Sequence, residues 1–457
     1  MGCKMKKIWI LFMLLSSLLI LAGCGGGGGG GGDDEYYDDG NNLSKLASMN
    51  ITDAKSVFIS KGSGSGTNSL GMNSTAKSSG NSSTSRLYKI NIDDKVEKIS
   101  FFDKNNNEIT LNEYGMELVP VFLENINNDY LAVGFSDTWS AAQNYMYSPQ
   151  VVLLARKSDG AIFRLKDTID CSQMNNGYGF VKNKGVFSSD ENNNIYYLAN
   201  VTDMYTCQSR ILKLSVSGSD MTSIPVTPSS IDWIYNYEVD KKGNVYWEGQ
   251  SNLLMASVRK ITPGNGGNLV DPPVFSNIWK DQDGLFHYID GRDIKIINPE
   301  SFVSEPYGTF PDDPNSSWTD FKVSLNGYTY LMSYGGILEV YNPGKSPRSV
   351  NLGFSIGTVY GVTTTENYYY IAGCDDSYPV PNDFLIRVTP GGNSYISLLG
   401  NDYRVYAFAA SETDGITFNA LHKGNLKKVM GNISNSGVVS LLNYERDEEV
   451  VVLERIR

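Results

Sequence analysis

The chain has 457 residues, 46 of them glycine, with 12% aromatic residues and a formal net charge of −12 at pH 7. This length suits two or three average domains or one large repeat domain, and the composition favours an all-β protein with many tight turns. An acidic surface repels phosphate backbones, and no cluster of Arg or Lys follows the first residues, so we expect no nucleic-acid partner.

The N-terminus has the pattern of a secretory signal. Three lysines (Lys4, Lys6 and Lys7) precede the apolar run 8–20, which is too short for a comfortable membrane-spanning helix, and Leu21-Ala22-Gly23-Cys24 follows. These four residues resemble the lipobox of bacterial lipoproteins, with Leu, two small residues and an invariant Cys. The resemblance implies a signal peptide over 1–23 and lipidation of Cys24, for example with palmitate. An ordinary secretion signal with an incidental cysteine is the alternative.

A lipidated Cys24 would anchor the protein to a membrane, because each buried acyl methylene contributes about 0.8 kcal/mol. In Gram-negative lipoproteins, Asp directly after the Cys favours the inner membrane. Gly25 follows here, so the resemblance favours the outer membrane of the cell envelope. Eight consecutive glycines and an acidic, polar stretch come next, and we expect residues 24–50 to form a flexible tether.

The stretch from Asp232 to Val270 is the clearest example of a unit that recurs over residues 51–457. Asp240-Lys241-Lys242-Gly243-Asn244 separates a β-rich run from Val245-Tyr246-Trp247, and the runs 257–261 and 268–270 follow. Short β-branched and aromatic runs separated by Gly, Asn, Asp and Pro predict strands joined by hairpin turns. Four such strands would make one antiparallel sheet of about 40 residues.

Similar groups of runs precede and follow this unit. The first group has only three clear strands (57–59, 87–90 and 96–102), and one strand, 449–453, remains at the C-terminus. If this last strand completes the first sheet, the sheets close into a ring. We therefore predict a β-propeller of about eight, or seven, four-stranded blades. Two β-sandwich domains are the alternative, but they explain neither the regular spacing nor the matched ends. The chain lacks the Gly-to-Trp blade signature of quinoprotein-like repeats.

The long, unusual loops are predicted to open on one face of the propeller. Loops on a rigid scaffold are where binding usually occurs, and aromatic rings beside polar groups suit a protein or glycan partner. Packing of these aromatics against each other is the alternative. The candidate binding residues on this loop face are Trp139, Tyr145, Tyr147, Tyr205, Asp375, Asp376 and Tyr378.

Besides Cys24, the chain after the signal peptide contains Cys171, Cys207 and Cys374. Two of them should pair in an oxidising envelope. Cys171 and Cys207 fall on loops of the same predicted face in adjacent blades, so we predict that disulfide. It would stabilise the fold by roughly 3 to 4 kcal/mol.

Signals for catalysis, metals and cofactors are weak. His287 and His422 lack metal-ligand spacing, and no nucleophile or phosphate-loop motif occurs. Asp103 begins a run that resembles a calcium loop at alternate positions but has Glu108 where Gly is needed, so a strand turn is the simpler interpretation. We predict a non-enzymatic binding or scaffold module without metal or cofactor. The alternative is a propeller hydrolase or lyase acting on an envelope polysaccharide through carboxylates such as Glu238, Asp375 or Asp376.

Overall fold

The computed structural model describes only β-strands, turns and connecting segments, without an α-helix among the described residues. No helix in the described part of the chain is long and apolar enough to cross a membrane. The described ranges are 45–61, 85–113, 116–137, 151–165, 187–202, 207–217, 220–228, 231, 233–250, 257–273, 278–280, 284–290, 293–309, 323–325, 328–332, 337–341, 348–352, 354–365, 368–377, 380–388, 395–410, 415–442, 444 and 448–456.

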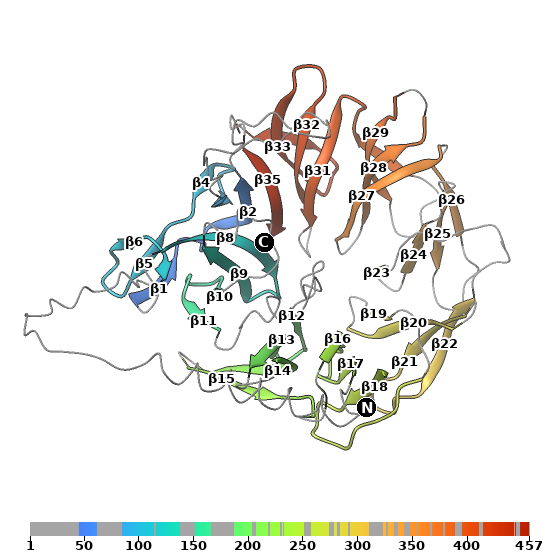
Figure 1. The fold of residues 1–457 in the computed structure, drawn as a ribbon. Helices are drawn as coiled ribbons and strands as arrows, with labels where there is room; N and C mark the ends of the chain where they lie inside the picture. The colour runs from blue at the N-terminus through green and yellow to red at the C-terminus, as the bar shows by residue number, and fades with distance from the viewer. Residues whose placement is uncertain are drawn as a thin grey trace, which may run out of the picture. The chain divides into compact units, whose positions relative to one another are not determined.

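The strands pair antiparallel in sheets of three to five strands, and most of them are labelled in Figure 1. Three sheets contain the N-terminal strands, in the orders β1-β5-β6, β35-β2-β3-β4 and β11-β10-β9-β8-β7. Their strands are β1 (Leu46–Met49), β2 (Ala54–Lys61), β3 (Ser85–Asn91), β4 (Val96–Lys98), β5 (Phe101–Asp103), β6 (Glu108–Ile109), β7 (Asn112–Glu113), β8 (Met116–Asn125), β9 (Tyr130–Asp137), β10 (Val151–Arg156), β11 (Ile162–Arg164) and β35 (Glu449–Arg455).

The remaining sheets each use strands that are consecutive in the chain, in the orders β12-β13-β14-β15, β16-β17-β18, β19-β20-β21-β22, β23-β24-β25-β26, β27-β28-β29-β30 and β31-β32-β33-β34. The strands are β12 (Phe187–Ser189), β13 (Ile195–Thr202), β14 (Cys207–Ser217), β15 (Asp220–Pro225), β16 (Trp233–Val239), β17 (Val245–Gln250), β18 (Ser257–Thr262), β19 (Ile278–Lys280), β20 (Phe286–Asp290), β21 (Asp293–Ile297), β22 (Ser304–Thr309), β23 (Val323–Leu325), β24 (Tyr328–Met332), β25 (Ile337–Tyr341), β26 (Arg348–Asn351), β27 (Ile356–Thr364), β28 (Tyr369–Asp375), β29 (Asp383–Val388), β30 (Tyr395–Leu399), β31 (Tyr403–Ala410), β32 (Ile416–His422), β33 (Lys427–Ile433) and β34 (Val439–Leu442).

The prediction of an all-β chain with many four-stranded antiparallel sheets is confirmed for the described residues, although the sheets β1-β5-β6 and β16-β17-β18 have three strands and β11-β10-β9-β8-β7 has five. Two runs of the sequence differ locally from the prediction. The run 96–102 is not one strand: it divides into β4 and β5, which belong to different sheets. The amide of Ile99 still donates to the carbonyl of Leu87 in β3 (2.9 Å). Beyond it the chain turns to Asn50: the Ser100 amide donates to the side-chain oxygen of Asn50 (2.8 Å), and the Ser100 carbonyl accepts the Asn50 amide (3.2 Å). The run 268–270 forms only an isolated bridge between Ile261 and Val270.

The C-terminal strand pairs with the first long strand of the chain. β35 lies antiparallel to β2, with Arg455 opposite Ser56 and Leu453 opposite Phe58. The amide of Ile456 adds a hydrogen bond of 2.9 Å to the carbonyl of Lys55. The predicted pairing between the ends of the chain is therefore present in the structure.

β1 pairs with β5 and lies within the last residues of the segment assigned to the tether. Leu46 and Phe101 pack against an apolar layer that includes Met49, Leu131 and Phe135. Strand pairing and burial thus hold this part of the chain against the sheets that follow it.

Apolar side chains from different sheets pack together in several layers. Tyr197 of β13 packs in a layer with Leu154 of β10, and Tyr370 of β28 shares one with Phe418 of β32. A further layer joins Tyr88 of β3 to Met430 of β33, and so joins the first four-stranded sheet to the last. Since each fully buried side chain of this size contributes about 1.5 to 3 kcal/mol, neighbouring sheets stabilise one another.

The turn that opens many hairpins has one recurrent design. In the turn from β16 to β17, Asp240 accepts hydrogen bonds from the amides of Lys242 and Asn244 (both 2.9 Å) and from Nδ2 of Asn244 (2.7 Å). Gly243 completes the turn with φ of 78°, a left-handed conformation that glycine adopts without strain. Asp190 and Asp103 make the same three contacts in their own turns. Asp103 therefore belongs to a strand turn, as its spacing indicated.

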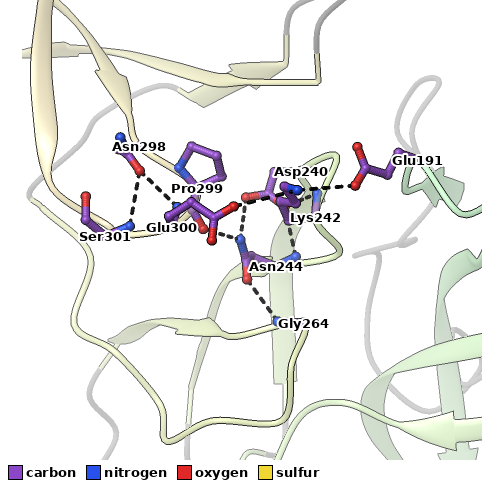
Figure 2. Close-up of polar contacts among 9 residues, drawn as sticks. All are labelled: Glu191, Asp240, Lys242, Asn244, Gly264, Asn298, Pro299, Glu300 and Ser301. Carbon is purple, nitrogen blue, oxygen red and sulfur yellow. Dashed lines mark hydrogen bonds and ion pairs between the residues drawn. The ribbon is translucent and has the colours of Figure 1, made fainter.

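The Asp240 turn also connects neighbouring hairpins (Figure 2). Nδ2 of Asn244 donates to the carbonyl of Pro299, and its Oδ1 accepts the amide of Gly264 (both 2.9 Å). Nζ of Lys242 lies 3.5 Å from a carboxylate oxygen of Glu191 and 3.6 Å from one of Glu300. These exposed ion pairs contribute little, whereas the buried Asn244 contacts fix the orientation of its amide.

Candidate functional site

Most of the residues predicted to form the binding face lie outside the described residues. These are Trp139, Tyr145, Tyr147, Tyr205 and Tyr378, and the same holds for Cys24 and Cys171. Cys207 begins β14, but only its backbone is described, so the Cys171–Cys207 disulfide stays a prediction. Cys374 is a buried free cysteine. Asp375 and Asp376 are the two predicted binding residues whose surroundings the structure gives.

Asp375 is 8% exposed and holds its own loop in place. Its carboxylate accepts the amides of Asn382 (2.7 Å) and Ser377 (3.1 Å) and Nδ2 of Asn382 (2.9 Å). Burial acts to raise the pKa of Asp375, but these donors outweigh it, so the pKa lies below its ordinary value. Asp375 therefore shapes the loop between β28 and β29, while Asp376 is exposed to solvent.

Beside this loop, Asp383 gathers three polar side chains from different elements. Asp383 begins β29 and is 3% exposed. It accepts a hydrogen bond of 2.6 Å from the hydroxyl of Tyr360 in β27. Nζ of Lys423 lies 2.7 Å from its second oxygen, and Nε of Arg404 in β31 lies 3.5 Å from the first. We call Tyr360, Asp383, Arg404 and Lys423 the Asp383 cluster.

The cluster holds its two cations at the surface. The side chain of Arg404 is 48% exposed and that of Lys423 is 34% exposed, although both contact the buried carboxylate. The Arg404 guanidinium donates to the Tyr360 hydroxyl (3.2 Å) and lies 5.6 Å from the centre of its ring. Burial raises the pKa of Tyr360, and the bond to Asp383 raises it further, so this phenol stays neutral.

Tyr406 extends this surface along β31. It follows Arg404 by two residues at a bulge of β31, where the register with β32 shifts between Val405 and Ala407. Tyr406 is 48% exposed and lies close enough to Arg404 to contribute to the raised pKa of the guanidinium. A guanidinium and a phenol ring exposed side by side can bind a carboxylate, a hydroxyl-rich surface or an aromatic group. Sequence reasoning missed Arg404 and Tyr406 because alternating polar and apolar residues in β31 indicate only a half-buried strand.

A second group of ionisable side chains lies around Lys280, the last residue of β19. Its ammonium donates to the carbonyls of Ser189 and Val239 (both 3.1 Å) and lies 3.3 Å from Oγ of Ser188, so it connects β12, β16 and β19. Burial raises the pKa of Glu238 in β16, and the charge of Lys280 opposes this shift. Of the three carboxylates named for the enzymatic alternative, Glu238 has the raised pKa that a proton donor needs.

No protein-family model and no curated protein sequence matches this chain. Among solved structures, it is similar to the β-propeller domain of the Trilobed protease from Pyrococcus furiosus, with a TM-score of 0.42, 9% identity, and coverage of 72% of this chain and 97% of the other. It is also similar to YCF48 bound to D1 peptide (TM-score 0.38, 12% identity, coverage 69% and 93%) and to YCF48 from Cyanidioschyzon merolae (TM-score 0.35, 11% identity, coverage 67% and 94%). These TM-scores lie below 0.5, so the likenesses do not define a function for this chain.

Proposed function

We propose that this protein is a lipid-anchored β-propeller of the bacterial cell envelope that binds a protein or glycan partner without transforming it. The apolar layers shared between sheets support the propeller, because blades of a propeller pack face to face. The pairing of β35 with β2 supports joining of the first and last blades. The lipobox ending at Cys24 supports the anchor, most simply in the outer membrane.

The observation that carries the binding role is the exposed pair Arg404 and Tyr406 beside the Asp383 cluster. The buried Asp383 carboxylate and the Tyr360 ring restrict the guanidinium of Arg404, so less conformational entropy is lost when a partner binds it. The loop that Asp375 shapes ends at Asp383, so the candidate site adjoins the predicted loop face. Its chemistry suits a partner that offers carboxylates or hydroxyl groups.

The test is capture of envelope proteins and of arrayed glycans by the purified protein and by the double variant Arg404→Ala/Tyr406→Ala. We expect the variant to lose most of the captured material. A matched control, Arg164→Ala/Ile224→Ala, removes an exposed arginine and an exposed apolar side chain from other sheets and should bind normally. Equal capture by all three proteins would contradict the proposed site.

A further variant, Trp139→Ala/Tyr378→Ala, tests the other residues assigned to the loop face. Loss of capture here, together with loss in the Arg404 variant, would extend the site along that face. Loss in the Trp139 variant alone would move the site away from the Asp383 cluster while keeping the binding role.

The enzymatic alternative rests on Glu238 and Lys280. A half-buried carboxyl with a raised pKa near a lysine can donate a proton to a leaving group. Release of soluble sugar from envelope polysaccharide, abolished in Glu238→Gln but retained in Arg404→Ala/Tyr406→Ala, would favour a hydrolase or lyase over a binding module.

A further inference from the structure

A hollow of about 510 Å³ lies between β3 and β4, the β5–β6 hairpin and the start of β8. Its floor is apolar and rigid, since Leu87, Ile99, Leu111, Leu118 and Phe135 are each less than 7% exposed and belong to one packed layer. A volume of this size lies within the range of about 300 to 1,000 Å³ that is usual for ligand pockets. The sheets that form this hollow differ from those that carry the Asp383 cluster.

The rim of the hollow carries charges of both signs on different elements. Arg86 and Lys98 come from β3 and β4 of one sheet, whereas Glu108 comes from β6 and Glu117 from β8, and all four are exposed. The side chain of Arg86 is 52% exposed, and its guanidinium lies 3.7 Å from Glu448. A hydrogen bond with Tyr88, with the charges of Glu448 and Glu117, raises the pKa of Arg86, so it is charged at the rim. One side of the rim therefore favours an acidic group and the other a basic group.

Two strand edges border the same hollow. β4 is the last strand in the order β35-β2-β3-β4, and β6 is the last in the order β1-β5-β6, so neither outer edge has a partner strand among the residues described. β4 also ends early. Lys98, the last residue of β4, lies opposite Tyr88 of β3. The first residues of β3, Ser85 and Arg86, therefore lie past the end of β4. Backbone groups at an edge of this kind pair readily with an added strand.

We propose that this hollow binds an extended peptide segment of a partner protein by strand addition. The peptide backbone pairs with the open edge beside β3 and β4 or at β6, and one apolar side chain enters the floor. An acidic residue on one side of it faces Arg86 and Lys98, and a basic residue on the other side faces Glu108 and Glu117. Backbone pairing supplies affinity, while the floor and the rim select the sequence.

The probe is a panel of fluorescent, end-blocked pentapeptides with the pattern acidic, Val, apolar, Val, basic, in which the central residue is Leu, Val or Phe. Fluorescence polarisation with the purified protein should show saturable binding. Replacing the central residue by Ser, or methylating the two Val amides, should weaken binding at least tenfold. Absence of saturable binding for the whole panel, or equal binding of the methylated peptides, would overturn the proposal.

The charge assignment has its own test. The variant Arg86→Glu/Lys98→Glu should weaken binding of the acidic and basic panel at least tenfold and should gain affinity for peptides with a basic residue at both ends. This gain distinguishes a changed site from a misfolded protein. The control Lys104→Glu/Lys427→Glu changes net charge equally at exposed lysines outside the hollow and should keep the original preference. An unchanged preference in the Arg86 variant would refute the assignment, whatever the outcome at Arg404 and Tyr406.

Discussion

The turns at Asp240 and Asp103 have the same hydrogen bonds but different burial, and they should therefore respond differently to truncation. Asp240 and Asn244 are 1% and 4% exposed. Asp240→Ala therefore leaves the amides of Lys242 and Asn244 without their acceptor inside the protein, and it leaves Nδ2 of Asn244 with only the carbonyl of Pro299. Asn244 cannot rotate to compensate, because Pro299 and Gly264 hold both ends of its amide.

Each buried donor left unpaired costs about 1 to 3 kcal/mol. Removing the Asp240 carboxylate also removes the energetic cost of burying its charge, which is visible in its raised pKa. This gain offsets part of the cost of the unpaired donors. We therefore expect Asp240→Ala to lower the free energy of unfolding by about 3 to 5 kcal/mol. The donors of the Asp103 turn stay accessible to water, so Asp103→Ala should cost much less.

Urea unfolding followed by tryptophan fluorescence measures the change in the free energy of unfolding, and hydrogen–deuterium exchange over 240–244 measures the local opening of the turn.

The two aspartates should also contribute to stability with opposite pH dependence. The pKa of Asp240 is raised from 3.8, so the stability it contributes is greatest below about pH 4 and falls as the pH rises through the folded pKa. Hydrogen bonds from Asn107 lower the pKa of Asp103, so its contribution is present above about pH 4 and is lost as the pH falls through the folded pKa. Equal costs for the two variants, or parallel pH profiles, would refute this reasoning.

Three further predictions concern single positions. Gly243→Ala should lower the melting temperature more than Gly266→Ala in thermal unfolding. Both glycines have φ near 80°, but a Cβ at Gly243 would lie 2.7 Å from the Tyr196 hydroxyl, whereas open space surrounds Gly266. Cys24→Ser should move the protein from the membrane fraction to the soluble fraction and abolish labelling with palmitate, and retention of either property would exclude lipidation at Cys24. Non-reducing peptide mapping should recover Cys171 linked to Cys207, with reduction lowering the free energy of unfolding by roughly 3 to 4 kcal/mol; alkylation of both thiols without reduction would contradict the disulfide.

The sheets could be predicted from sequence because their signals are local. Asp240, Gly243 and Asn244 specify a tight turn through contacts within five residues, and the flanking aromatic and β-branched runs become β16 and β17. The division of the run 96–102 could not be predicted in this way. It depends on Asn50, which lies far away in the chain and exchanges hydrogen bonds with the amide and the carbonyl of Ser100.

The candidate site was less predictable for the same reason. Asp375 looked like an exposed ligand, but its partner Asn382 lies seven residues later, outside the spacing of a short turn. Tyr360, Asp383 and Arg404 come from three strands, and none has a neighbour in sequence that marks it as part of a cluster. Only the fold brings them together.

The pairing of β35 with β2 has a consequence for how the protein is made. β2 and its partner β35 are separated by residues 62–448, so the first sheet cannot be completed until this intervening stretch has been synthesised. Contacts between residues so far apart slow folding, and until then β2 exposes a strand edge that can associate with other chains. If the protein is exported, as we propose, this delay is useful, because a chain that has not completed its first sheet can still be threaded through a translocation channel.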